Sequence, residues 1–88
     1  MDEHELIAKS FLEIQKYATI RQKQAFMADE LIDKPFFKDM TVTRIHQVLD
    51  ELSYDGKISF ELTDYQTYNY MASEPKAHLD AYTVTLLR

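Results

Sequence analysis

The sequence contains no cysteine and no tryptophan, and it has only one glycine and two prolines in 88 residues. Without cysteine, disulfide bonds and thiolate zinc sites are excluded, so we expect a reducing, cytoplasmic environment. Because glycine and proline are scarce and 45% of the residues are hydrophobic, little of the chain suits a disordered linker. We therefore expect residues 1–88 to fold as a single globular domain.

Long apolar runs and catalytic motifs are also missing. No apolar run approaches the ~20 residues of a transmembrane helix, and no basic region precedes an apolar stretch at the start, so we expect neither membrane insertion nor secretion. His4, His46 and His78 lack the spacing of metal ligands. No carboxylate accompanies a nucleophile or a glycine-rich phosphate loop. The sequence therefore predicts no enzyme, small-molecule substrate, metal or cofactor.

Positive charge is scarce as well, because 10 Lys and Arg face 15 Asp and Glu, for a net charge of −5. This acidity argues against nucleic acid, since Lys and Arg supply most non-specific affinity. The middle of the chain is less acidic, with its cations at Arg21, Lys23, Lys34, Lys38 and Arg44. A local basic face is therefore feasible, and useful affinity for DNA would then need a dimer.

Helical periodicity is present in the first half of the chain. Its apolar residues predict a first helix from about His4 to Tyr17. The next segment is ambiguous, because the residues from Thr19 have capping-box spacing, whereas Ile20 could form a short strand-like segment. We favour a second helix over at least 24–33, which ends before Pro35 because proline lacks a backbone donor.

The clearest helix spans residues 41–55. It has Thr41 as an N-cap in front and Gly56 just past its end, where a left-handed residue closes the last turn. One apolar stripe predicts its core face, and it consists of Val42, Ile45, Val48, Leu49 and Leu52. The other side carries residue types that read DNA grooves, namely Thr43, Arg44, His46 and Gln47.

The last third of the chain alternates in polarity and predicts a β-hairpin over 57–87. The register that keeps apolar partners on one face pairs Ile58 with Leu86, Phe60 with Val84 and Leu62 with Tyr82. Continued outward, this register extends the hairpin through residues 65–71 and 77–80, which makes an unusually long wing. The alternative is a loop between the strands, although tyrosines favour strands over loops.

Three helices followed by a hairpin, with the step Asp-Gly-Lys-Ile from the third helix into the hairpin, resemble the winged helix-turn-helix superfamily. The resemblance covers essentially the whole chain and is closest over 42–58, which is similar to many bacterial winged-helix regulators. It implies an α+β fold of three helices and a long C-terminal wing. It also implies that the major groove receives Thr41, Thr43, Arg44 and Gln47, with wing residues Lys76 and His78 near a minor groove or phosphate.

Two functional classes follow. In the first, the chain is a dimeric DNA-binding transcriptional regulator that binds double-stranded DNA through Thr41, Thr43, Arg44, His46, Gln47, Lys76, Arg21 and Lys23. In the second, it is a protein-interaction module that binds itself or another regulator through Tyr65, Tyr68 and Tyr70, since aromatic side chains are enriched in interfaces. The resemblance favours the first class, whereas the acidic charge favours the second.

Overall fold

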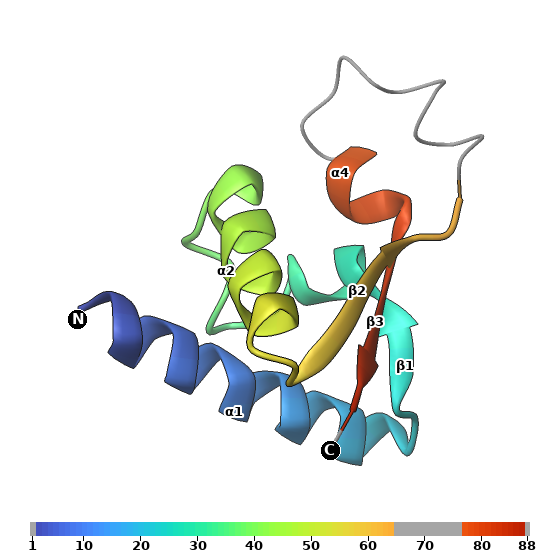
Figure 1. Ribbon diagram of the computed structural model, residues 1–88, viewed down its shortest axis with the longest axis horizontal. Coiled ribbons are helices and arrows are strands. Elements are labelled where there is room, and N and C mark those ends of the chain that lie inside the picture. Colours follow the sequence, from blue (N-terminus) through green and yellow to red (C-terminus); the bar gives the residue numbers. More distant parts are fainter. Residues whose placement is uncertain (1, 65–76, 88) are drawn as a thin grey trace.

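A computed structural model describes residues 2–64 and 77–87, with the backbone alone for residues 77 and 78. Over these described residues the fold is α+β, with two long helices, two short helical segments and a three-stranded antiparallel sheet (Figure 1). In chain order the elements are α1 (Glu3–Arg21), β1 (Ala25–Met27), the 3-10 helix η1 (Ala28–Leu31), α2 (Val42–Tyr54), β2 (Ile58–Leu62), α4 (Ala77–Asp80) and β3 (Tyr82–Leu86). The predicted architecture of three helices followed by a long hairpin is therefore wrong.

The first helix, α1, is longer than predicted. Asp2 caps its N-terminus by accepting a hydrogen bond from the Glu5 amide at 2.8 Å. The helix continues past Tyr17 to Arg21 and ends where Gln22 adopts a left-handed conformation with φ of 57°. The ambiguous segment after Tyr17 is thus the last turn of α1.

The predicted second helix over 24–33 does not form. Residues 25–27 are instead a strand that pairs with β3, with Phe26 opposite Val84, and only the four residues of η1 are helical. The Glu30 carboxylate accepts a hydrogen bond from the Met27 amide at 3.0 Å and another from the Tyr17 hydroxyl. These partners hold the segment in a tight turn, which local helical periodicity could not reveal.

The helix α2 agrees with the prediction. Thr41 is its N-cap, and its hydroxyl accepts a hydrogen bond from the Arg44 amide at 3.0 Å. Asp55 is the C-cap, and Gly56 follows with a positive φ of 75°, where an L side chain would be strained. The predicted apolar stripe faces the core, and its four fully buried members are Ile45, Val48, Leu49 and Leu52.

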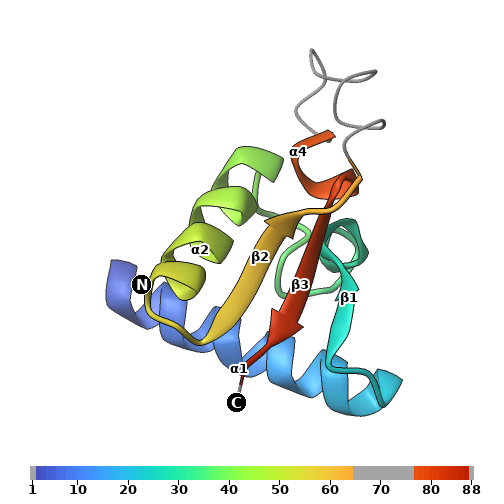
Figure 2. The same ribbon diagram turned by 45° about the vertical axis from the view of Figure 1, so that its right-hand side comes forward.

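The sheet has the order β1-β3-β2, so β3 lies in its centre. The predicted hairpin register is confirmed, because Ile58 pairs with Leu86, Phe60 with Val84 and Leu62 with Tyr82. Figures 1 and 2 show α1 crossing one end of the sheet, with α2 beside β2. The strand β1 adds to the far side of β3, where the sequence predicted no partner.

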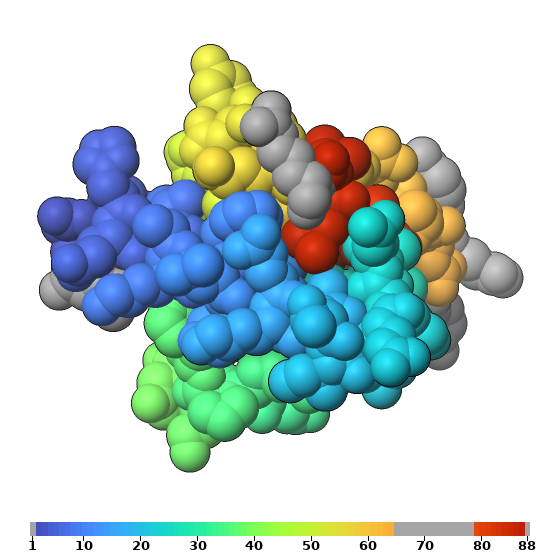
Figure 3. Space-filling model, turned by 90° about the horizontal axis from the view of Figure 1, so that it is seen from below, coloured from blue at the N-terminus to red at the C-terminus, as the bar shows by residue number. Residues whose placement is uncertain are grey.

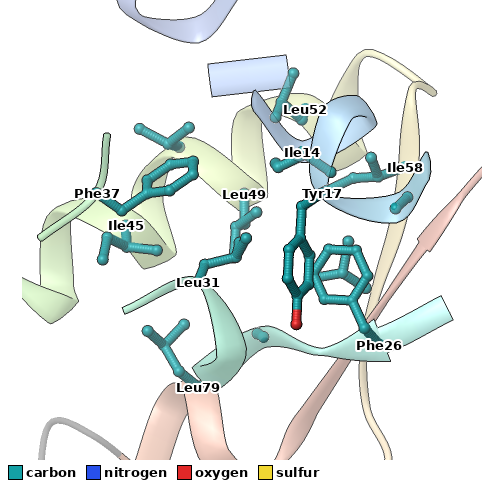
Figure 4. Packing of buried hydrophobic residues seen from close by; sticks show 14 residues of the cluster. Ile14, Tyr17, Phe26, Leu31, Phe37, Ile45, Leu49, Leu52, Ile58 and Leu79 are labelled. Atoms are coloured by element: carbon teal, nitrogen blue, oxygen red, sulfur yellow. The ribbon is translucent and has the colours of Figure 1, made fainter. Parts of the chain in front are cut away.

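The predicted extension of the hairpin is wrong over 77–80, because these residues form α4. Leu79 of α4 is fully buried and points toward Leu31 of η1 (Figure 4). A four-residue helical turn brings this side chain back over the core, and a continued strand would carry it away from the core. The other part of the predicted extension, residues 65–71, lies outside the described residues.

One hydrophobic core joins all the elements (Figure 4). Its aromatic members include Tyr17 and Phe26, whose rings meet edge to face with centroids 5.0 Å apart. Phe37, from the series of turns between η1 and α2, is only 1% exposed. Its fully buried aliphatic members come from α1, η1, α2, α4 and β3, and they are Ile14, Ala28, Leu31, Ile45, Val48, Leu49, Leu52, Leu79 and Val84. Ile58 of β2 is 1% exposed. No helix among the described residues has the length and apolarity to span a bilayer.

Candidate functional site

The outer surface of α2 near its N-terminus carries four of the eight residues predicted to bind DNA. Thr43 and Gln47 are exposed there, whereas the Thr41 hydroxyl is used as the helix cap. The Arg44 guanidinium donates to the Glu3 carboxylate at 2.5 Å and to the Gln47 side-chain oxygen at 3.2 Å. The Arg44 side chain therefore reaches from α2 to the first turn of α1.

Carboxylates surround this arginine. A shallow depression of about 440 Å³ is lined by Glu3, Arg44, Gln47, Asp50 and Glu51. Three carboxylates thus share the depression with one cation. Because phosphate is repelled by carboxylates and the arginine already has a carboxylate partner, this surface is a poor match for a DNA backbone.

The remaining predicted DNA-binding residues do not join this surface. His46 packs against the sheet, with its ring centroid 5.1 Å from that of Phe60 and 5.4 Å from that of Tyr82. Arg21 is the last residue of α1 and Lys23 follows its C-cap. The C-terminal end of α1 lies far from the start of α2 in both ribbon views (Figures 1 and 2). The side chains of Lys76, His78, Tyr65, Tyr68 and Tyr70 are outside the part of the chain that the structure describes.

A hollow borders α1 on the side of α2. We call it the acidic groove; it measures about 700 Å³ and is lined by Glu3, His4, Ile7, Ala8, Phe11, Leu12, Gln15, Glu51, Leu52, Asp55 and Lys57. Figure 3 looks onto the outer surface of α1, in blue, with the C-terminal end of α2, in yellow, beside it. Leu12 is 54% exposed, so its side chain offers an apolar contact at the surface of the groove.

Charged groups line the rim of the acidic groove. Glu51 and Asp55 come from the last turns of α2, and Glu3 is already paired with Arg44. The Lys57 ammonium lies 5.3 Å from the centroid of the Phe11 ring, which is a cation–π distance. The groove therefore combines an apolar floor with a rim that is mainly negative.

The sequence carried a signal for this groove, although its shape could not be predicted. The inward side of α1 needs only four buried residues, Ser10, Ile14, Tyr17 and Ala18. Ile7 and Phe11 are partly buried against the core and Leu12 is exposed, so the three continue the apolar surface of α1 toward the end of α2. This additional apolar surface borders a groove because the end of α2 lies beside α1.

Among the described residues, no group of three histidine, aspartate or glutamate side chains is placed to hold a metal ion. Comparison of the chain with models of known protein families, with curated proteins and with solved structures found no match. The functional argument therefore depends on the surface of the molecule itself.

Proposed function

We propose that this chain is a protein-interaction domain that binds an amphipathic, basic helix of another protein in the acidic groove. The observation that carries the proposal is the apolar floor of Ile7, Phe11 and Leu12 in a hollow of about 700 Å³. A helix that lies in a groove buries apolar side chains at i, i+3, i+4 and i+7 spacing, and such a floor accommodates them.

The charge of the rim selects the kind of helix. Because Glu3 is paired with Arg44, we expect Glu51 and Asp55 to face the partner. A partner with Lys or Arg beside its apolar stripe would place opposite charges next to these carboxylates. Symmetric pairing of two copies through this groove would instead bring both sets of carboxylates together, and like-charge contacts at an interface are costly. The charge pattern thus favours a different protein over a second copy.

The proposal can be tested with a helical peptide that has leucines at i, i+3, i+4 and i+7 and lysines on its other side. Binding is measured by fluorescence anisotropy with the full chain. Leu12→Gln and Glu51→Lys should each weaken binding about tenfold, which corresponds to about 1.4 kcal/mol. The matched controls are Ile20→Gln, another exposed apolar residue of α1, and Glu61→Lys, an exposed carboxylate on β2. Neither control lines the acidic groove.

Two results would contradict this proposal. One is the absence of binding at low salt. The other is binding that the two groove variants and the two controls weaken equally, since that pattern would reflect general charge and hydrophobicity. Thermal melts of each variant show whether the fold is kept.

DNA binding is the second candidate, and the observation that favours it is the exposed turn of α2 that carries Thr43, Arg44 and Gln47. Because Glu3 neutralises Arg44, Glu3→Gln should strengthen binding to mixed-sequence duplex DNA, whereas Arg44→Ala should abolish it. Anisotropy at low and moderate salt measures both effects. If neither the wild type nor Glu3→Gln binds duplex DNA at low salt, this candidate is excluded.

A further inference from the structure

A second hollow borders α1 on the side opposite to the acidic groove. We call it the cationic groove; it measures about 280 Å³ and is lined by Glu13, Lys16, Tyr17, Ile20, Arg21, Lys34, Pro35 and Phe37. In Figure 3 it lies between α1 and the residues that follow η1, in green. Ile20 is 78% exposed there, so its side chain offers an apolar contact at the surface.

Three cations and one carboxylate line the cationic groove, although the chain as a whole carries a net charge of −5. The Lys34 ammonium lies 4.3 Å from the centroid of the Tyr17 ring, and the Arg21 guanidinium lies 5.9 Å from the same centroid. Two positive charges are thus held over one aromatic ring. The third cation, Lys16, is 70% exposed and lies 3.5 Å from Glu13.

The floor of the cationic groove is held firmly. The Tyr17 hydroxyl donates to the Glu30 carboxylate, and the Tyr17 ring packs edge to face on Phe26. Phe37 is anchored in the core, and its amide donates to the Lys34 carbonyl at 2.9 Å. The Arg21 guanidinium also forms an ion pair with the Glu30 carboxylate, 3.7 Å away, which leaves the Lys34 ammonium as the cation of the groove held mainly by the Tyr17 ring. The cations therefore surround a preformed apolar floor.

We infer that the cationic groove binds an acidic peptide segment of a partner protein, with one aliphatic or aromatic side chain seated against Ile20 and Pro35. Charge complementarity selects the acidic flanks, because Lys16, Arg21 and Lys34 would each face a carboxylate. The apolar floor selects the central side chain. Duplex DNA fits less well, because a long polyanion would also meet the acidic remainder of the molecule.

This site is independent of the function proposed for the acidic groove, since the two grooves lie on opposite sides of α1 and share no lining residue. If both are used, α1 separates a basic partner from an acidic one. The chain would then connect two proteins of opposite charge. A test of one groove leaves the other as its internal control.

The test uses the full chain, labelled with nitrogen-15, and a blocked peptide in which Asp and Glu flank a central Leu-Phe pair. Binding is followed by amide chemical shifts, which locate the peptide, and by anisotropy, which measures affinity. We expect shifts in the C-terminal half of α1 and in residues 34–37. Lys16→Glu combined with Lys34→Glu should weaken binding more than tenfold, and Ile20→Gln should weaken it severalfold.

Matched controls separate specific recognition from general attraction. Lys9→Glu combined with Lys38→Glu makes the same change in net charge at exposed positions outside the lining of the groove, and it should weaken binding much less. A peptide with Gln and Asn in place of Glu and Asp should bind weakly, as should the acidic peptide at high salt. Leu12→Gln in the acidic groove should leave binding unchanged.

Three outcomes would overturn the inference. The first is the absence of shifts at low salt. The second is equal weakening by the two double charge reversals, which would indicate only non-specific attraction. The third is stronger binding of duplex DNA than of the peptide at the same groove residues, which would assign the groove to nucleic acid. Retained binding in Leu12→Gln, together with loss in the Lys16 and Lys34 variant, supports the inference even if the acidic groove binds nothing.

Discussion

The helix α2 and the segment from β1 to η1 are stabilised in different ways. Thr41 caps α2 from the adjacent position, and Gly56 closes it from the other end. The segment over 25–31 depends on residues distant in sequence, since β1 pairs with β3 and Glu30 binds Tyr17 of α1. Much of what defines α2 is therefore local, whereas the shape of β1 and η1 is imposed by the rest of the fold.

This difference teaches where the molecule is vulnerable. A local change at one end of α2 removes a single interaction, and the buried stripe still holds the helix. A change in the segment over 25–31 disturbs the sheet, the end of α1 and the floor of the cationic groove together, because Tyr17 of α1 packs on Phe26, donates to Glu30 and lines that groove. We therefore expect mutations in the segment to have effects that spread further.

The largest effect is expected from Leu31→Ala in η1. Leu31 is fully buried, and deleting such a side chain typically costs about 2–5 kcal/mol of unfolding free energy. Leu49→Ala in α2 is the matched control, because Leu49 is equally buried. Denaturant unfolding should show losses of similar size in both variants.

The two leucine variants should differ in local stability. Hydrogen exchange should show that Leu31→Ala opens the amides of β1 and η1 before those of α2, because β1 and η1 depend on contacts with β3 and α1. Leu49→Ala should instead lower protection across the core. Equal protection of β1 and α2 in Leu31→Ala would contradict the comparison.

Glu30→Ala should have the next largest effect, at about 2 kcal/mol, because it removes the acceptor for the Met27 amide and the Tyr17 hydroxyl. Glu30→Gln should cost less, since an amide oxygen still accepts one of these bonds. Denaturant unfolding at neutral pH measures both. A cost for Glu30→Ala below that of Glu30→Gln would show that the carboxylate does not organise the turn.

The same carboxylate predicts a dependence on pH. Partial burial raises the pKa of Glu30, but hydrogen bonds from Tyr17 and Met27 and the nearby Arg21 outweigh this, so the pKa is lowered overall. A carboxyl group with a lowered folded-state pKa stabilises the protein above its unfolded pKa of about 4.3 and loses that contribution as the pH falls through the folded value. The advantage of the wild type over Glu30→Gln should therefore be full near pH 7 and shrink below about pH 4. Denaturant unfolding of both proteins from pH 7 to below pH 4 checks this pH dependence. A stability advantage of the wild type that grows in acid would contradict it.

The same distinction between local and distant determinants explains what the sequence could predict. The bounds of α2 and the pairing of Ile58 with Leu86 follow from caps and alternation, which involve neighbouring residues. The turn at Glu30 depends on Tyr17, thirteen positions earlier, so helical periodicity over 24–33 predicted the wrong element. The α4 turn similarly depends on a buried place for Leu79.

The candidate sites were less predictable than the fold. Arg44 and Gln47 were correctly expected on the outer side of α2, but the sequence could not show that Glu3 reaches Arg44 across 41 positions. Both grooves arise where α1 meets segments distant in sequence, so their residues share no motif. Leu12 and Ile20 are the apolar residues of α1 that could have indicated the two grooves. In the sequence they look like core residues, and only the packing of α1 shows that they are exposed.

The smallest effect is expected at the N-cap of α2. Thr41→Ala removes the hydroxyl that accepts from the Arg44 amide, and loss of an N-cap typically costs about 1 kcal/mol. Thr41→Ser keeps the hydroxyl and should remain within a few tenths of a kcal/mol of the wild type. Because the cap acts locally, hydrogen exchange in Thr41→Ala should rise only in the first turn of α2, with β1 unaffected. Faster exchange in β1 would mean that the N-terminus of α2 and the segment from β1 to η1 are coupled. The cap would then not act locally, and the contrast between locally and distantly stabilised regions would be contradicted.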